Sequence, residues 1–207
     1  MCCRYYILPR GVEWDPIRES AESALVMRRF REAGAALVTS GEVRPTDVVP
    51  VLASNRQGGR SIFPMRWGFR LEGAKPMTLL NARAETAAQK PAFREAWAAH
   101  RCAVPASGYY EWERRPDGAG RSRTGDKYAV EAPGEPILWL CGLYRIEAGL
   151  PVFVVLTREP SAELGKLHDR MPLILPKECI RDWVNPESRP DEIAKNALTD
   201  MIFEKTG

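Results

Sequence analysis

Cys2 is the residue of this sequence with the most unusual chemical potential, because removal of Met1 would leave a cysteine at the amino terminus. The α-amine (pKa about 7.7 to 8.0) and the thiol (pKa about 8.5) of that one residue are both partly reactive at neutral pH. Such an aminothiol can take up an aldehyde: the amine forms a Schiff base, and the thiolate then closes a thiazolidine ring on the same carbon. Position alone also allows Cys2 to have no role. While Met1 is attached, the amine is an amide and this chemistry cannot begin.

Residues 43–70 combine basic and aromatic side chains in a way that is typical of single-stranded nucleic-acid binding. Basic groups contact phosphates, and interleaved rings stack on bases. Against a single acidic residue, Asp47, the segment holds Arg44, Arg56, Arg60, Arg66 and Arg70 together with Phe63, Trp67 and Phe69. For any one of these arginines, a solvated surface position is an equally good interpretation.

The charge is unevenly distributed along the chain. The formal net charge is +3, but residues 1–126 carry 20 basic and 14 acidic side chains (+6), whereas residues 127–207 carry 10 and 13 (−3). Of the 30 basic residues 23 are arginine, whose planar guanidinium binds phosphate in a bidentate way. The charge therefore favours an anionic partner, although an arginine-rich composition also arises in GC-rich genomes.

The five cysteines are scattered and contain no C-x-x-C pair. They are Cys2, Cys3, Cys102, Cys141 and Cys179. An odd, widely spaced set argues against a disulfide framework and against a zinc site. We expect reduced thiols, no metal and no cofactor.

Several elements must position these residues. Asp15 and Pro16 before a 3.6-residue apolar pattern predict a helix with Asp15 as N-cap, ending before Gly34. DVVPVLAS and RSIFPMRWGF, joined by NRQGG, predict a β-hairpin. A second helix is expected over residues 85–100, with Pro91 as a possible interruption.

The second half of the chain is mostly β-like. Four strands are expected in CAVPASGYYEWE, KYAVEAP, ILWLCGLYRIE and PVFVVLTRE, and their loop lengths predict an antiparallel meander. A short helix SAELGKLH, a strand PLILP and helices in CIRDWV and DEIAKNALTDMIFEK follow. The fold class is α+β: one domain over 1–207, with a mainly antiparallel, barrel-like sheet, flanking helices, a core of about 2–185 and a C-terminal helical segment of about 190–205.

Length and composition agree with one globular domain. A chain of 207 residues with 44% hydrophobic residues can bury a core without disulfide or metal staples. No apolar run reaches the roughly 18 residues of a membrane span. The first residues lack a signal-peptide pattern, so we expect a cytosolic protein.

The motifs taken together resemble the SOS response-associated peptidase (SRAP) family, whose members process abasic sites and crosslink themselves to DNA. MCCRYY resembles the family's M-C-G-R-F/Y start. VRPTDVVPVL, MRWGF, LLNARAET, SGYYEW and LHDRMPLIL then follow in the family's order. Each motif is weak alone, but their order and spacing across residues 2–185 make a specific signal.

The resemblance implies a role for each matched residue. Cys2 is similar to the family's nucleophile, and Asn81 to an asparagine near the new amino terminus, although Asn81 could also form an Asx turn. Glu111 matches the family's acid, which exchanges a proton with the amine. Glu113 lies two residues on, so the sequence leaves both carboxylates open. His168 matches the histidine that protonates the sugar oxygen.

The resemblance also implies a partner, namely single-stranded DNA with an abasic site. The implied phosphate ligands are Arg4, Arg83 and Arg170, and the implied apolar contacts at the lesion are Pro45 and Trp67. Trp112 could also contact the lesion, but a strand tryptophan is more often in the core. His100, which follows a helical stretch, matches no motif and could complement the helix dipole. We expect a monomer that acts without a membrane.

One departure and two alternative functions remain. Cys3 stands where the family usually has glycine, so a side chain there could crowd the site or oxidise with Cys2. The first alternative is a thiol peptidase or amidohydrolase that uses Cys2 with His168 or Glu111. The second is a non-covalent single-strand binder whose affinity depends on salt and not on the lesion. The sequence does not say whether Met1 leaves by self-cleavage or by an aminopeptidase.

Overall fold

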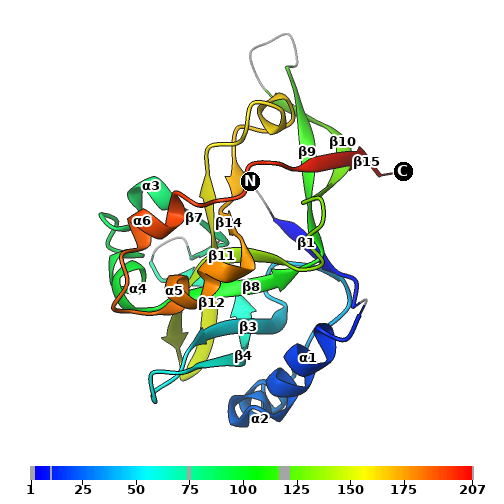
Figure 1. Ribbon diagram of the computed structural model, residues 1–207. Coiled ribbons are helices and arrows are strands. Elements are labelled where there is room, and N and C mark those ends of the chain that lie inside the picture. The colour runs from blue at the N-terminus through cyan, green and yellow to red at the C-terminus, as the bar shows by residue number, and fades with distance from the viewer. Residues whose placement is uncertain (1–2, 10, 74–75, 117–121, 207) are drawn as a thin grey trace.

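The computed structural model describes residues 3–9, 11–73, 76–116 and 122–206, and its centre is a small barrel (Figure 1). Five strands close the ring in the order β3 (Val48–Ser54), β4 (Arg60–Trp67), β12 (Leu150–Arg158), β11 (Leu138–Glu147) and β8 (Arg101–Ala106), and β8 pairs with β3 again. All neighbours are antiparallel except β4 and β12, which are parallel. The structure thus confirms the predicted α+β, mainly antiparallel barrel.

The barrel strands are buried over long runs because helices cover their outer faces. All six residues of β8 are buried, and so are residues 151–157 of β12. The helix α5 (Lys177–Val184) packs on β8 and β3, and α1 (Trp14–Ser23) packs on β4 and β3. A strand covered on both faces has no need of polar alternation. Helical residues 94–99 contact β11, and helical residues 84–87 and 25–32 contact β12, which explains why ILWLCGL and PVFVVL read as continuous apolar segments.

The predicted hairpin is confirmed as β3 and β4. Its register runs from Ser54 opposite Arg60 to Val48 opposite Arg66. The Asn55 side chain holds the turn by accepting hydrogen bonds from the backbone N–H groups of Gln57 (3.0 Å) and Gly59 (2.9 Å). Short polar side chains that bond the backbone two residues on are typical of such turns.

A second sheet stands beside the barrel and supplies most of the polar residues discussed below. Its order is β15 (Ile202–Lys205), β10 (Ser122–Glu131), β9 (Gly108–Pro116), β1 (Arg4–Ile7) and β2 (Gly41–Val43). The segment CAVPASGYYEWE is therefore not one strand: the chain leaves the barrel at Ser107 and enters the second sheet as β9. Gly108 is required there, because a Cβ would collide with the Tyr6 hydroxyl and the Val130 carbonyl.

Short strands complete the sheets. β7 (Asn81–Arg83) runs parallel to β12, β13 (Met171–Pro172) pairs with β12, and β14 (Ile174–Leu175) pairs with β11. β5 (Phe69–Leu71) and β6 (Met77–Leu79) form a separate pair. Because β7 and β13 both contact the end of β12, the motifs LLNARAET and LHDRMP come together although they are far apart in the sequence.

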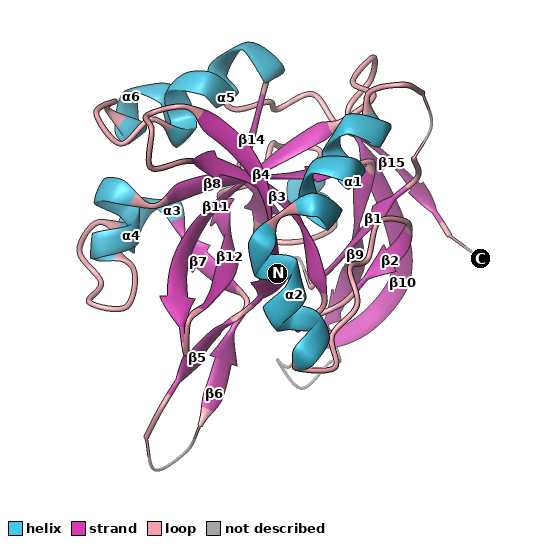
Figure 2. Ribbon diagram, turned by 90° about the horizontal axis from the view of Figure 1, so that it is seen from below, coloured by secondary structure: helices cyan, strands magenta, loops and turns pink. Residues whose placement is uncertain are grey.

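The predicted first helix is two helices (Figure 2). α1 begins at Trp14, so Glu13 occupies the N-cap position and Asp15 lies in the first turn, contrary to the expected Asp15 cap. The chain then breaks at Ala24, whose ψ of 131° is extended, and continues as α2 (Leu25–Glu32). The break lets Ile17 of α1 join the barrel core while Met27 and Phe30 of α2 bury against Val48 in a separate cluster.

The helix expected in CIRDWV is confirmed as α5, whereas the other later helices are shorter than the sequence predicts. The expected helix over 85–100 is divided into α3 (Ala84–Ala87) and α4 (Arg94–Ala99) around Pro91. SAELGKLH contains only a 3₁₀ turn, η1 (Leu164–Lys166). The expected helical segment 190–205 is wrong after α6 (Pro190–Ala194), because residues 202–205 form β15. Phe203 packs edge-on against Tyr128 of β10, an interaction that a strand provides.

A buried arginine fastens the helices to the barrel. Arg101 is 1% exposed, and its guanidinium donates to the backbone carbonyls of Trp97 (2.7 Å), Trp183 (2.8 Å) and Asn185. These acceptors lie in α4, in α5 and just after α5. Burial lowers the pKa of Arg101, but a guanidinium remains charged. Arg101 thus satisfies helix-terminal carbonyls that would otherwise be buried without a partner. Within the described residues, no helix is both long and apolar enough to cross a membrane.

Candidate active site

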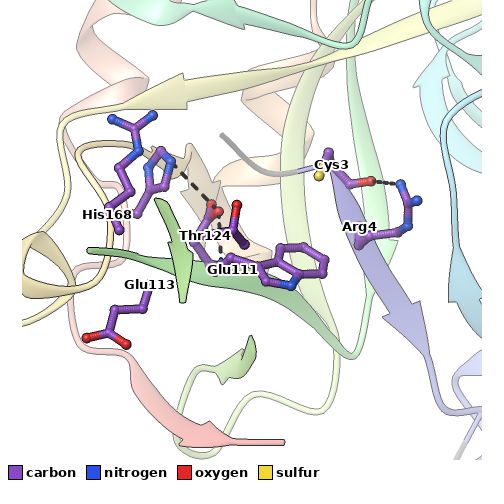
Figure 3. A pocket seen from close by; sticks show the side chains of 8 residues that line it. Cys3, Arg4, Glu111, Glu113, Thr124 and His168 are labelled. Atoms are coloured by element: carbon purple, nitrogen blue, oxygen red, sulfur yellow. Dashed lines mark hydrogen bonds and ion pairs between the residues drawn. The ribbon is translucent and has the colours of Figure 1, made fainter. Parts of the chain in front are cut away.

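An open pocket of about 630 Å³ lies where β1, β9, β10 and the loop after η1 meet (Figure 3). Its walls are formed mainly by polar and charged side chains, which makes it suited to a polar ligand. The residues that line it are Cys3, Arg4, Glu111, Trp112, Glu113, Arg114, Thr124 and His168. Three of the residues to which the resemblance assigns a role, Arg4, Glu111 and His168, are therefore brought together.

Glu111 and His168 form the centre of the pocket. The Nε2 atom of His168 lies 3.9 Å from Oε1 of Glu111, and each side chain is only 6% exposed. The Glu111 carboxylate also accepts the backbone N–H of Trp112 (3.2 Å). Burial raises the pKa of Glu111, although the nearby Arg114 opposes that shift. A carboxyl group with a raised pKa can both take and return a proton near neutral pH.

The other ring nitrogen of His168 has two neighbours. The backbone N–H of Arg170 donates to Nδ1 at 3.1 Å, and Oδ1 of Asp169 lies 2.9 Å from the same Nδ1. Asp169 in turn forms an ion pair with Arg114, with 2.9 Å between Oδ2 and Nη1. Burial lowers the pKa of His168 to about 4, with a contribution from the positive Arg114, while Asp169 acts in the opposite direction. His168 is therefore neutral at pH 7.

The structure places the two carboxylates of β9 in different surroundings. Glu113 accepts a hydrogen bond from Nε of Arg115 at 2.8 Å. Figure 3 shows its side chain pointing away from His168, whereas Glu111 points toward it. Glu111 is the carboxylate that can act together with the histidine, and Glu113 forms part of the rim.

Arg4 enters the pocket from β1, next to Tyr110 of β9. Its Nε lies 3.2 Å from Glu42 of β2, and Nη1 donates to the Cys3 carbonyl at 2.8 Å. The same Glu42 carboxylate binds Lys127 at 3.0 Å, and this hydrogen bond is the main reason why the pKa of Glu42 is lowered. Arg4 is thus held at the mouth of the pocket beside a second cation.

Arg170 lies behind the histidine. Its Nη2 donates to Glu85 and to the Thr157 carbonyl, both at 2.7 Å, and the side chain is only 11% exposed. Thr157 is paired with Arg83, which is exposed at the end of β7. Asn81, which is also in β7, pairs with Val155 of β12 and is not among the residues that line the pocket. The LLNARAET segment therefore flanks the histidine wall without lining the pocket.

Trp67 is not positioned as the sequence predicts. It is fully buried between Tyr5 and Phe153, and its indole N–H donates to the Leu80 carbonyl at 3.0 Å. A fully buried ring does not reach a DNA base in this structure, so the predicted lesion contact of Trp67 gains no support and stays a prediction. Pro45 is half-buried in the loop after β2, and the next residue donates its N–H to the Trp67 carbonyl. The half-buried Trp112 is the tryptophan that lines the pocket.

The basic segment 43–70 does not assemble into one surface at the pocket. Its five arginines are all described, and none of them lines the pocket. Arg44 is bound to Glu42, Arg60 lies at the hairpin turn, and Phe69 is buried. The local charge pattern was therefore a poor guide to the site.

Cys2, the predicted nucleophile, lies outside the described residues, and so does Met1. Cys3, the next residue, is half-buried and lines the pocket. His100 lies elsewhere, with its ring 5.2 Å from that of Tyr144. Of the two histidines, only His168 belongs to the pocket.

Three neighbours of the site were not found from the sequence. Asp169 and Arg114 are joined by an ion pair beside His168, and Glu85 binds Arg170. Two of them lie in quoted motifs, Asp169 in LHDRMP and Glu85 in LLNARAET. An acidic residue directly beside a candidate histidine was a signal that could have indicated the first. Arg114 had no comparable signal.

The chain is similar to known proteins over most of its length. The family described as "SOS response associated peptidase (SRAP)" matches residues 1–205. The chain is 31% identical over 172 residues to abasic site processing protein YoaM of Bacillus subtilis, covering 76% of this chain and 74% of that one. It is 29% identical over 159 residues to abasic site processing protein YedK of Escherichia coli, covering 73% and 68%.

Solved structures show the same fold. A protein from Bacteroides thetaiotaomicron superposes with a TM-score of 0.71 at 21% identity, covering 99% of this chain and 91% of the other. A phage-related protein from Bordetella bronchiseptica gives a TM-score of 0.72 at 21% identity, covering 99% and 94%. At such identities the likeness establishes the fold alone. The family match over nearly the whole chain shows that this protein belongs to the SOS response associated peptidase (SRAP) family.

Proposed function

We propose that this chain, once Met1 is removed, captures abasic sites in single-stranded DNA through Cys2. The observation that carries the proposal is the Glu111–His168 pair, buried in a pocket whose wall includes the residue joined to Cys2. An amine nucleophile needs a group that takes its proton, and a closed sugar needs a group that protonates its ring oxygen. The pocket holds one candidate for each. The relatives named as abasic site processing proteins point to the same substrate.

The chemistry uses the ring-opened sugar, which presents an aldehyde at C1′. The Cys2 amine adds to that carbon, and loss of water gives a Schiff base. The Cys2 thiolate then adds to the same carbon and closes a thiazolidine. The balance is one aldehyde plus one aminothiol giving one thiazolidine and one water. The atoms that react belong to this chain and to the DNA.

Glu111 is suited to the proton transfers at nitrogen. Its pKa is raised by burial, so the carboxylate can take a proton from the ammonium group and give it back when the ring opens again. His168 is neutral, and its Nε2 faces Glu111 from within the pocket. It is suited to pass a proton to the sugar oxygen and to recover it in the reverse direction. The same two groups thus serve capture and self-reversal.

The thiol gives the adduct a protective character. A Schiff base alone makes the C2′ protons acidic and favours β-elimination, which would cut the strand. Closure of the ring by the thiolate removes the iminium and blocks that route. We infer that this protein protects an abasic strand, with any strand cleavage a minor side reaction.

Recognition of the strand is assigned to residues around the pocket. Arg4 lines it, and Arg83 is exposed beside Arg170 at the histidine wall. Guanidinium groups at these positions can bind successive phosphates. Trp112, partly exposed in the pocket, takes the apolar role that the sequence assigned to Trp67. A base can lie flat on a protein ring only when it is outside the duplex stack, so this arrangement favours single-stranded DNA.

The proposal is tested by incubating the mature protein with a single-stranded oligonucleotide that carries one abasic site, followed by a denaturing gel. A protein–DNA band that survives denaturation is expected with the abasic strand and not with the intact strand. The family description also mentions a peptidase, and the same thiol could remove Met1 by self-cleavage. A generic unstructured peptide in the same reaction should stay intact. Cleavage of that peptide without a DNA adduct would favour a thiol peptidase instead.

A further inference from the structure

Asp169 and the backbone of Arg170 approach the same atom, Nδ1 of His168, with opposite demands. The Arg170 N–H, at 3.1 Å, requires a lone pair on Nδ1, whereas the Asp169 carboxylate, at 2.9 Å, requires a proton there. A neutral imidazole carries one proton, so Nδ1 can satisfy only one of the two neighbours. The outcome decides whether Nε2, which faces Glu111, carries a proton or a lone pair.

We propose that Asp169, anchored by Arg114, is a positioning residue that keeps the proton on Nδ1 of His168 and leaves Nε2 free to exchange protons with the pocket. A hydrogen bond to a carboxylate is stronger than one between neutral groups, so Asp169 prevails over the Arg170 N–H. The ion pair from Arg114, at 2.9 Å, fixes the carboxylate in place through its other oxygen. Although Asp169 is 59% exposed, this second contact limits its motion.

The need for such a residue follows from proton balance. This step rests on the proposed function: His168 must pass a proton to the sugar oxygen. The proton leaves the Glu111 carboxyl and binds Nε2. This gives an imidazolium whose Nδ1–H still donates a hydrogen bond to Asp169. It then moves from Nε2 to the sugar oxygen and leaves the neutral Nδ1–H ring. If Nδ1 carried no proton at the start, Nε2 would already hold the only one, and giving it away would leave an imidazolate.

The groups around His168 give two opposite predictions for its titration. Glu111 and Arg114 face it from β9, and Asp169 and the Arg170 backbone face it from its own loop. Asp169 stabilises the imidazolium, whereas Arg114 destabilises it. Replacing Arg114 should therefore raise the pH at which His168 titrates. Replacing Asp169 should lower that pH and also change the tautomer.

Imidazole ¹⁵N NMR tests this without any DNA. The chain has only two histidines, and a His100→Gln background leaves His168 as the one signal. At pH 7 the Nδ1–H tautomer is expected to dominate. In Asp169→Asn, whose amide can itself donate to Nδ1, the preference should reverse to Nε2–H. In Arg114→Met the titration midpoint should rise by about one pH unit. Asp126→Asn is the matched control, because that aspartate also pairs with an arginine, Arg115, but lies outside the pocket lining.

Two results would overturn the inference: an Nε2–H tautomer in the wild-type protein, or an unchanged tautomer in Asp169→Asn. If Asp169→Asn does not fold, the wild-type tautomer and the Arg114→Met midpoint still decide it. Crosslinking to abasic DNA is measured separately. If the tautomer reverses as expected but the wild-type protein makes no DNA adduct, the role of Asp169 stands and the proposed function fails.

Discussion

The Nε2 atom of His168 lies 3.9 Å from Oε1 of Glu111, and within the described residues these are the only buried histidine and the only buried carboxylate. They come from β9 and from the loop after η1, which are more than fifty residues apart. Two titratable groups that are buried side by side in a pocket shift each other's pKa, and such pairs are typical of acid–base sites. The proposed acid–base chemistry is therefore assigned to this pair, and the consequences of that assignment can be measured.

Removing either member of the pair should slow the chemistry without weakening DNA binding. Glu111→Gln and His168→Ala are each expected to reduce the rate of crosslinking or of its reversal by about 10² to 10⁴-fold, the usual contribution of a general acid or base. Glu113→Gln is the matched control on the same strand, since that carboxylate is bound to Arg115. Quench-flow or timed denaturing gels give both rates. If Glu111→Gln reacted at the wild-type rate and Glu113→Gln reacted slowly, Glu113 and not Glu111 would be the acid–base group.

His168 should also make folding stability depend on pH. Its pKa falls from an ordinary value of 6.5 to about 4 on folding, so the unfolded chain binds more protons between these values. The contribution of His168 to the free energy of unfolding is therefore largest above pH 6.5 and is lost as the pH falls toward 4. Glu111, whose pKa is raised, acts in the opposite direction, being stabilising at low pH and less so as the pH rises.

The two effects are separated by comparing wild type with His168→Gln in urea unfolding at pH 4.5, 5.5 and 7. The free-energy difference between the two proteins should change in favour of wild type as the pH rises through this window. His100→Gln provides the control, because His100 lies outside the pocket. A pH-independent difference for His168→Gln would contradict the lowered pKa.

Replacing Trp112 should lower the affinity for DNA, whereas replacing Trp67 should lower the stability of the fold. Trp112→Ala is expected to lower affinity for a strand with a reduced, aldehyde-free abasic analogue by about 1 to 3 kcal/mol, the value of a base–aromatic stack, with the salt slope unchanged. Trp67→Ala removes a fully buried ring and should instead destabilise the fold by about 3 to 5 kcal/mol. Equilibrium binding and thermal unfolding of both variants are the measurements. Loss of affinity in a stable Trp67→Ala would restore the role that the sequence assigned to it.

Arg83 should contact phosphate. It is exposed, and no ion pair is seen for it within the part of the chain that the structure describes. Arg83→Ala is expected to weaken binding to single strands of any sequence and to reduce the slope of log affinity against log salt by about 0.7. Arg28→Ala on α2, which removes an exposed arginine bound to Glu32, is the control and should leave the slope unchanged. Equal slopes for wild type and Arg83→Ala would place the strand elsewhere.

Local patterns predicted the strands well and the burial of individual side chains less well. The NRQGG turn fixed the β3–β4 hairpin, because Asn55 and the glycines specify its geometry. Trp67 and Trp112 both lie in β-like segments, and periodicity alone does not tell which face a closed barrel encloses. Residues 195–205 read as a helix, yet Phe203 finds its partner Tyr128 on β10, a tertiary contact that propensity does not contain.

The site itself was predicted as a set of motifs and not as a geometry. Glu111 and His168 were identified from GYYEW and LHDRMP, and the structure places them together. Arg114 and Asp169 were missed, because their ion pair exists only when β9 and the loop after η1 are packed side by side. Asn81 was assigned to the chemistry, but its strand flanks the pocket wall. That assignment, like that of Cys2, stays a prediction.

The most direct test of the account is the fate of the adduct when the thiol alone is removed. The mature wild-type protein and Cys2→Ala are incubated with a single-stranded abasic oligonucleotide, and the products are separated on a denaturing gel and weighed by mass spectrometry. Wild type should give a durable adduct whose mass equals protein plus DNA minus one water, whereas Cys2→Ala should give none that survives heating. Cys3→Gly, which restores the residue usual in the family, should retain the adduct. A Cys2→Ala adduct as durable as that of wild type would contradict the mechanism.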